Sequence, residues 1–179
     1  MSTTTTDLRY PIGKYTFADS TTRQQVAEWV EDVARVPAAL RAAVKGLDAS
    51  QIETPYRPGG WTVRQLVHHL ADSHLNAYTR FKLALTEDTP TIKPYDEGAW
   101  ADLEDNRTVA ISVSLDLLEA LHTRWIALLR VMTPDQMARE FRHPEKGRTM
   151  RLDGALGMYA WHGRHHVAHV TALREREGW

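Results

Sequence analysis

Apolar residues recur at steps of three and four along four long stretches of this 179-residue chain, a spacing typical of helices that bury one face. The stretches run from about 21 to 47, 62 to 86, 114 to 132 and 153 to 177. The second and third are joined by a long polar connection, residues 87–111, and the other two links are shorter. The pattern predicts an all-α fold: a four-helix bundle with a long crossover between helices two and three.

Local signals refine these boundaries. Pro37 lies inside the first stretch and is expected to kink or split that helix. Thr62 and Gln65 have the spacing of a capping box, so they are expected to open the second helix. Asp153 is expected to cap the fourth helix, after a short strand at about 149–152.

The chain has the length of one compact domain. Residues 1–18 read as a polar tail followed by a strap, and residues 19–179 as a single bundle domain. A net charge of −1 gives no electrostatic reason to expect nucleic acid or an anionic membrane as partner. No apolar run approaches the roughly 18 residues that a membrane span needs, and the N-terminus lacks an apolar signal core, so we expect a cytoplasmic protein.

Histidines interrupt the buried face of the fourth helix. His162 and His166 are four residues apart, which places both imidazoles on one helix face, in the middle of an apolar stripe. A buried imidazole without a partner costs about 1–3 kcal/mol, and a shared metal ion would satisfy both. His165 and His169 have the same spacing, but their stripe is less apolar. The sequence therefore favours His162 and His166 as metal ligands.

A third ligand is expected on the second helix. His69 lies on the side that carries the apolar residues, whereas His68 lies among polar neighbours and is expected to be more exposed. We therefore predict His69. Asp72 is either a solvated surface charge or a partner that holds an imidazole N–H and so fixes the tautomer of a ligand.

Three histidines without a fourth protein ligand are the pattern of a catalytic metal site, in which a water or a substrate atom takes the open position. Imidazole suits zinc, nickel, copper or iron, and the sequence does not choose among them. Cysteine is absent, which excludes disulfides, thiolate ligands and a cysteine nucleophile.

Two segments resemble the metal-ligand motifs of the DinB/YfiT family: residues 60–74, from Gly60-Trp61-Thr62 to Asp72-Ser73-His74, and residues 161–169. The flanking segments 8–14, 86–90, 94–97 and 178–179 are also similar to that family, so the resemblance covers nearly the whole chain. It implies a four-helix bundle that binds one divalent metal ion per subunit and that forms a homodimer. Zinc and nickel are the first candidates for this ion. The family motifs place the ligands at His69, His162 and His166.

The resemblance implies a metal-dependent hydrolase acting on a small electrophilic molecule. Some relatives are instead transferases that use a low-molecular-weight thiol such as bacillithiol, and a metal can supply a thiolate from such a cofactor. The stripes offer no clear general base, which modestly favours thiol transfer and leaves the catalytic residues unassigned. One alternative to an enzyme is a non-catalytic metal-binding protein. The simplest alternative is that the histidines are ordinary core and surface residues that bind no metal.

Overall fold

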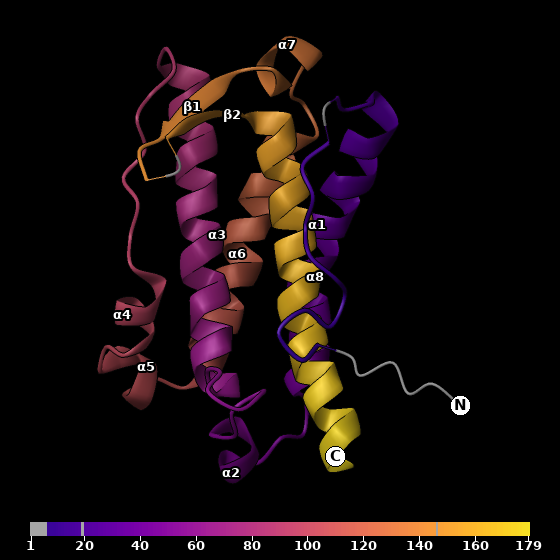
Figure 1. Cartoon of the computed structure of the whole chain (residues 1–179), viewed down its shortest axis with the longest axis vertical. Helices are drawn as coiled ribbons and strands as arrows, with labels where there is room; N and C mark the ends of the chain where they lie inside the picture. The colour runs from indigo at the N-terminus through magenta and orange to yellow at the C-terminus, as the bar shows by residue number, and fades with distance from the viewer. Residues whose placement is uncertain (1–6, 19, 146) are drawn as a thin grey trace.

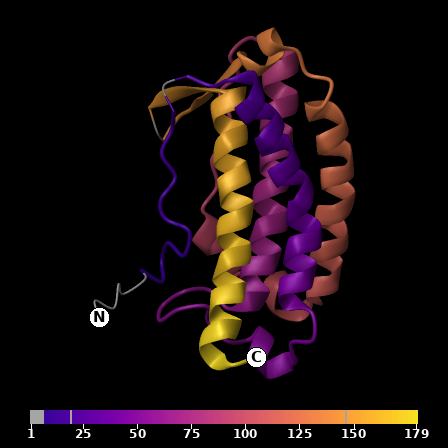
Figure 2. The same cartoon turned by 90° about the vertical axis from the view of Figure 1, so that its right-hand side faces the viewer.

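Four long helices run along the longest axis of the molecule (Figures 1 and 2). The computed structural model describes residues 7–18, 20–145 and 147–179. α1 packs along α8 and α6, and α3 packs along α6 and α8. The predicted all-α four-helix bundle is confirmed, with these bounds: α1 (Arg23–Val44), α3 (Val63–Thr86), α6 (Ile111–Leu129) and α8 (Leu152–Glu177).

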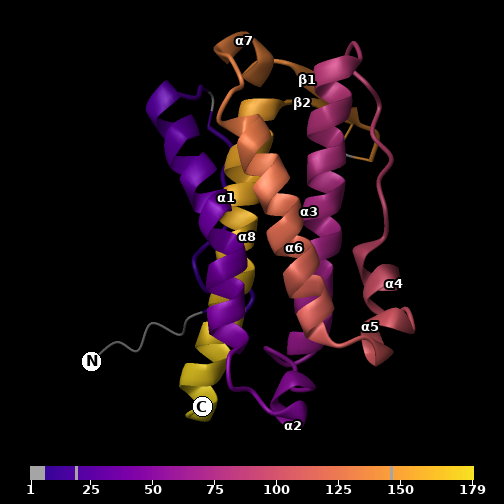
Figure 3. The ribbon, with the colours of Figure 1, turned by 180° about the vertical axis from the view of Figure 1, so that it is seen from behind.

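Short elements close the two ends and fill the crossover. At one end, α2 (Ala49–Ile52) joins α1 to α3 (Figure 1). The crossover contains α4 (Glu97–Ala101) and α5 (Asp105–Thr108), and both contact α3. At the opposite end lie α7 and an antiparallel hairpin (Figure 3). Their bounds are α7 (Pro134–Met137), β1 (Glu140–His143) and β2 (Arg148–Arg151).

A side-chain cap explains where α3 begins, but not where α8 begins. The Thr62 hydroxyl accepts a hydrogen bond from the Gln65 N–H, and the Thr62 N–H donates to the side-chain oxygen of Gln65, so the predicted capping box at the start of α3 is confirmed. The prediction that Asp153 caps α8 is wrong. Strand β2 leads directly into the helix, Arg151 takes the cap position, and the Leu152 N–H is already bonded to the Arg139 carbonyl. The Asp153 carboxylate instead pairs with Arg151 and accepts from the Gly154 N–H.

Pro37 does not split α1, which runs unbroken from Arg23 to Val44. Proline has no N–H, so the carbonyl of Val33, four residues earlier, lacks its usual helical donor. The side chain of His122 on α6 replaces that donor, with Nδ1 at 2.9 Å from the Val33 oxygen. A missing backbone bond in α1 is thus made good by a contact between two helices.

The core consists of two apolar clusters stacked along the bundle. One is centred on Phe81 and Trp125 towards the hairpin end, and the other on Leu70 and Leu118. Each long helix passes from one cluster to the other. Between the clusters, α3, α6 and α8 contribute buried or half-buried histidines, which we call the histidine layer: His69, His74, His122, His162 and His166.

An N-terminal strap, residues 7–18, runs beside α8 (Figure 1). The carbonyl of Gly13 accepts from the Trp161 indole N–H at 3.2 Å, and the Tyr15 hydroxyl donates to the Gly154 carbonyl at 3.4 Å. The first part of the predicted tail, residues 1–6, lies outside the described residues, as does residue 19 at the predicted domain boundary. The division at that point therefore stays a prediction.

Among the residues that the structure describes, none of the helices combines the length and the apolar character needed to cross a membrane.

Candidate metal centre

Three imidazoles converge in the histidine layer. The Nε2 atom of His162 lies 3.1 Å from Nε2 of His166 and 3.4 Å from Nε2 of His69. One ring nitrogen from each residue falls within 4.8 Å of the other two. At a zinc–nitrogen distance of about 2.0 Å, two ligands of a tetrahedral ion lie roughly 3.3 Å apart. The two Nε2 separations therefore suit one shared ion.

Helix geometry produces this convergence. His162 and His166 are one turn apart on α8, and their ring centroids are 4.4 Å apart. His69 reaches them from α3 and is backed by Trp61, whose ring centroid lies 4.5 Å from that of His69. Trp61 is held by the loop before α3, where its carbonyl accepts from the Tyr56 N–H.

Burial keeps the three rings uncharged. It lowers the pKa of His69 to about 4. Burial also lowers the pKa values of His162 and His166 well below the usual value, and the neighbouring imidazoles add to the effect. Metal coordination requires neutral imidazole, so these residues are in the required form near pH 7. The donor set consists of three nitrogens, and among the described residues no carboxylate joins the cluster. These residues fit a metal with an open position.

Two further histidines of the histidine layer, His74 and His122, extend from His162 on the side away from His69 and His166. The Nδ1 atom of His162 lies 3.4 Å from Nε2 of His74, and Nδ1 of His74 lies 2.8 Å from Nε2 of His122. Neither His74 nor His122 was among the residues predicted from the sequence to have a role. A signal existed, because His74 fills the gap between Leu70 and Ala77 in the apolar stripe of α3.

The remaining histidines of α8 form a separate pair. Nε2 of His165 and Nε2 of His169 are 3.0 Å apart, and the rings face Trp161 and Tyr56 respectively. Neither residue belongs to the group of three.

The expectation that His68 is more exposed than His69 is wrong. Their exposed fractions are 6% and 7%, and Nδ1 of His68 lies 2.7 Å from the Ser114 hydroxyl oxygen. The polar neighbours of His68 misled the prediction because α5 and the crossover cover this side of α3.

Asp72 lies on the same side of α3 as the crossover and is half-buried. Burial raises its pKa to about 6, and the negative charge of Asp105 adds to the shift. Its backbone carbonyl accepts from the Asn76 side chain. The role of Asp72 as a partner of a ligand imidazole stays a prediction.

Comparison with known proteins places this chain in a family. A sequence model described as the DinB superfamily matches residues 32–170. The chain is 53% identical to a Bacillus subtilis protein named "Putative metal-dependent hydrolase YfiT", over 98% of this chain and 99% of that protein. It is 52% identical to a Bacillus mycoides protein whose name also begins "Putative metal-dependent hydrolase", over 97% of this chain and 99% of that protein.

A solved structure is equally similar. The structure of Bacillus subtilis YfiT, described as having "an unusual four-helix bundle topology", superposes with a TM-score of 0.94 at 53% identity. The match covers 96% of this chain and 98% of that one.

Proposed function

The chain belongs to the DinB superfamily, and from that premise we propose that it is a metal-dependent hydrolase of the YfiT type in which His69, His162 and His166 hold one divalent ion. The observation that carries the proposal is the convergence of three buried imidazole nitrogens at separations that suit one ion. The names of both relatives contain the words "Putative metal-dependent hydrolase", which supports the same activity class. Zinc and nickel are the first candidates, because both accept three imidazole ligands.

When bound, a divalent ion at this position supplies Lewis acidity, which lowers the pKa of a water or a thiol at its open position. The protein contributes three neutral ligands that leave the positive charge of the site undiminished. It also limits access of water, since His69 and His166 are buried and the Trp61 ring packs against His69. Beside the ligands, Arg80 donates to the Tyr159 hydroxyl at 2.8 Å, which fixes a polar group near His162.

Thiol transfer is the second candidate. In the described part of the chain, no carboxylate joins the histidine cluster to act as a general base. The whole sequence lacks cysteine, so a thiol nucleophile would have to come from a small molecule. Both observations favour a low-molecular-weight thiol as co-substrate, with a chloro-aromatic or an epoxide as the electrophile.

An assay with and without added thiols separates the two. The purified protein, loaded with zinc or with nickel, is tested on activated esters, chloro-aromatics and epoxides, each with no thiol, glutathione or bacillithiol. Hydrolysis proceeds without a thiol, whereas transfer requires one. If the protein binds metal but turns over none of these substrates, the result would favour a non-catalytic metal-binding role.

A histidine substitution tests the metal site itself. We expect about one metal ion per chain in the wild-type protein and a loss of metal and turnover in His166→Ala. His165→Ala is the matched control, because it removes the neighbouring imidazole from the same turn and should keep the metal. Equal metal content in the two variants would exclude the assigned ligand set.

The proposal also includes the assembly and substrate size that the family resemblance implies, a homodimer and a small molecule. Sedimentation velocity of the purified protein tests the first, and a monomer at micromolar concentration would contradict it.

A further inference from the structure

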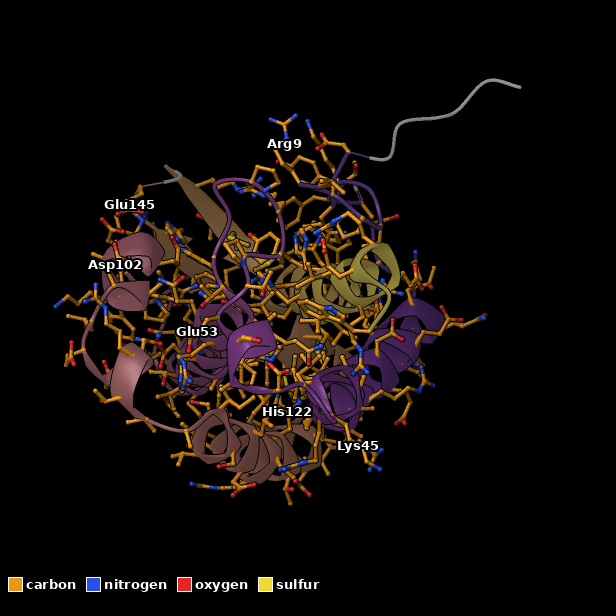
Figure 4. The ribbon with its side chains drawn as sticks, turned by 90° about the horizontal axis from the view of Figure 1, so that it is seen from below. Arg9, Lys45, Glu53, Asp102, His122 and Glu145 are labelled. Atoms are coloured by element: carbon orange, nitrogen blue, oxygen red, sulfur yellow. The ribbon has the colours of Figure 1, made fainter. Side chains whose placement is uncertain are left out.

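A chain of three imidazoles connects the proposed metal ligand His162 to the backbone of α1. It runs from the Val33 carbonyl to His122 on α6, then to His74 on α3, and then to His162 on α8. Each of the four long helices therefore contributes one residue to this chain of hydrogen bonds. Figure 4 looks along the bundle and labels His122 where α6 and α1 lie side by side.

The direction of each hydrogen bond follows from the first one. A carbonyl oxygen can only accept, so Nδ1 of His122 carries the hydrogen that points to Val33 at 2.9 Å. A neutral imidazole carries one N–H, and burial disfavours a second proton on His122. Its Nε2 atom therefore presents a lone pair to His74.

The same reasoning passes along the chain. Nδ1 of His74, 2.8 Å from the His122 lone pair, must carry the hydrogen, which leaves the Nε2 atom of His74 as an acceptor. Nδ1 of His162 then donates to that acceptor across 3.4 Å. The Nε2 atom of His162 is left with a lone pair, and this atom faces Nε2 of His69 and Nε2 of His166.

The starting carbonyl is available because of Pro37. An ordinary residue at position 37 would offer its N–H to the Val33 carbonyl as part of the helix ladder, and proline has none. His122 is thus the donor that takes the vacated place.

We propose that His74 and His122 are positioning residues that fix His162 in the Nδ1–H tautomer, so that its Nε2 lone pair is oriented for metal before metal arrives. Ligand histidines commonly donate their other N–H to a carboxylate, a carbonyl or a water. Here two further imidazoles convey that function from a carbonyl on the far side of the bundle. This inference rests on the ligand role of His162 in the proposed function.

The first test needs no substitution. In a long-range hydrogen–nitrogen correlation spectrum of the nitrogen-15-labelled, metal-free protein, His122, His74 and His162 should each show the Nδ1–H tautomer. A spectrum with Nε2–H on His162 would overturn the proposal. Because the sample contains neither metal nor substrate, this result is independent of whether the protein is a hydrolase.

The second test measures zinc affinity by competition with a chromophoric chelator. We expect His74→Phe to bind zinc about 10–100-fold more weakly than the wild-type protein, the usual loss when a partner of a ligand is removed. We expect His122→Phe to weaken binding about 10-fold, because it acts one imidazole further away, and to let His162 populate the Nε2–H tautomer. Unchanged affinity and tautomer in His122→Phe would refute the chain.

His68→Phe is the matched control, since His68 is equally buried on α3 but contacts Ser114 instead of the chain of imidazoles. The zinc affinity of His68→Phe should stay within about twofold of the wild-type value. This change is much smaller than the loss of affinity expected for His74→Phe. A loss in His68→Phe as large as that in His122→Phe would show that any buried histidine on these helices matters equally, which contradicts the proposal.

Discussion

At the scale of single residues, the buried histidines make the metal-free protein sensitive to mild acid. Burial lowers the pKa of His69, His122 and His165 to about 4, against about 6.5 in the unfolded chain. Between these values the unfolded state binds more protons, so the free energy of unfolding falls as the pH decreases from about 6.5 towards 4. Chemical denaturation at a series of pH values measures this. A free energy that stays constant from pH 7 to pH 5 would contradict it.

A single substitution tests the origin of this dependence. His122→Leu removes one buried imidazole, so its free energy of unfolding should fall less steeply over the same interval, by up to about 1.4 kcal/mol per pH unit. The measurement is the slope and not the absolute stability, because loss of the Val33 contact destabilises the variant at every pH. A slope equal to that of the wild-type protein would show that His122 already binds its proton in the folded state.

The residues of the candidate site were predictable to different degrees. His162 and His166 could be chosen because they interrupt an apolar stripe at helical spacing, and His69 because it shares the inward face of α3. The structure brings these three together. The apolar stripe of α3 marked His74 as an inward-facing residue, but it did not give His74 or His122 a role, since their contacts join α3, α6 and α8 and depend on how these helices pack.

At the scale of elements, two glycines of α8 differ sharply in their surroundings. A Cβ at Gly163 would lie 2.4 Å from a methyl group of Val36 on α1, whereas one at Gly154 would meet nothing closer than 3.9 Å. Gly163→Ala should therefore destabilise the fold by about 1–3 kcal/mol through overpacking. Gly154→Ala should be neutral or stabilising by up to about 1 kcal/mol, since alanine favours helix. Urea unfolding of both variants measures the difference, and equal effects would mean that α1 and α8 can separate here at no cost.

Element boundaries followed local chemistry where that chemistry was sufficient. The capping box at Thr62 fixed the start of α3. The start of α8 was mispredicted because it depends on a partner strand. β1 pairs with β2 as far as Arg151, and this pairing fixes Arg151 in the extended conformation from which the helix begins. The split expected at Pro37 was wrong as well, whereas the alternative of a kink stays a prediction. The continuous helix is stabilised by a donor from α6, which lies 89 residues away in the sequence.

At the scale of the whole molecule, metal should stabilise the fold. A ligand that binds only the folded state adds about 2.7 kcal/mol at a free concentration of one hundred times its Kd. For a chain of this length that corresponds to a rise of roughly 5–10 °C in Tm. Differential scanning calorimetry with zinc and then with excess chelator measures it. His166→Ala is the control and should show no zinc-dependent rise, and a wild-type Tm that ignores zinc would exclude a site of this kind.

The overall architecture was the most predictable level, because four amphipathic stretches and one long crossover leave few arrangements other than a bundle. The predicted ligand set required α3 and α8 to be neighbours, but the position of α6 was not predictable in the same way. The crossover lets α6 pack between α1 and α3, and that placement brings His122 within reach of both Val33 and His74.

His69 and His162 are separated by 93 positions in the sequence yet are adjacent in the fold. An ion held by both would tie the second long helix to the last one and enclose more than half of the chain in a loop. A covalent link that closes a loop of about 100 residues stabilises a protein by roughly 4.7 kcal/mol through the entropy of the unfolded chain. In a protein without cysteine, the metal centre would then act as a reversible cross-link, formed when metal is available and removed by a chelator. It would have the stabilising role that a disulfide has in many secreted proteins.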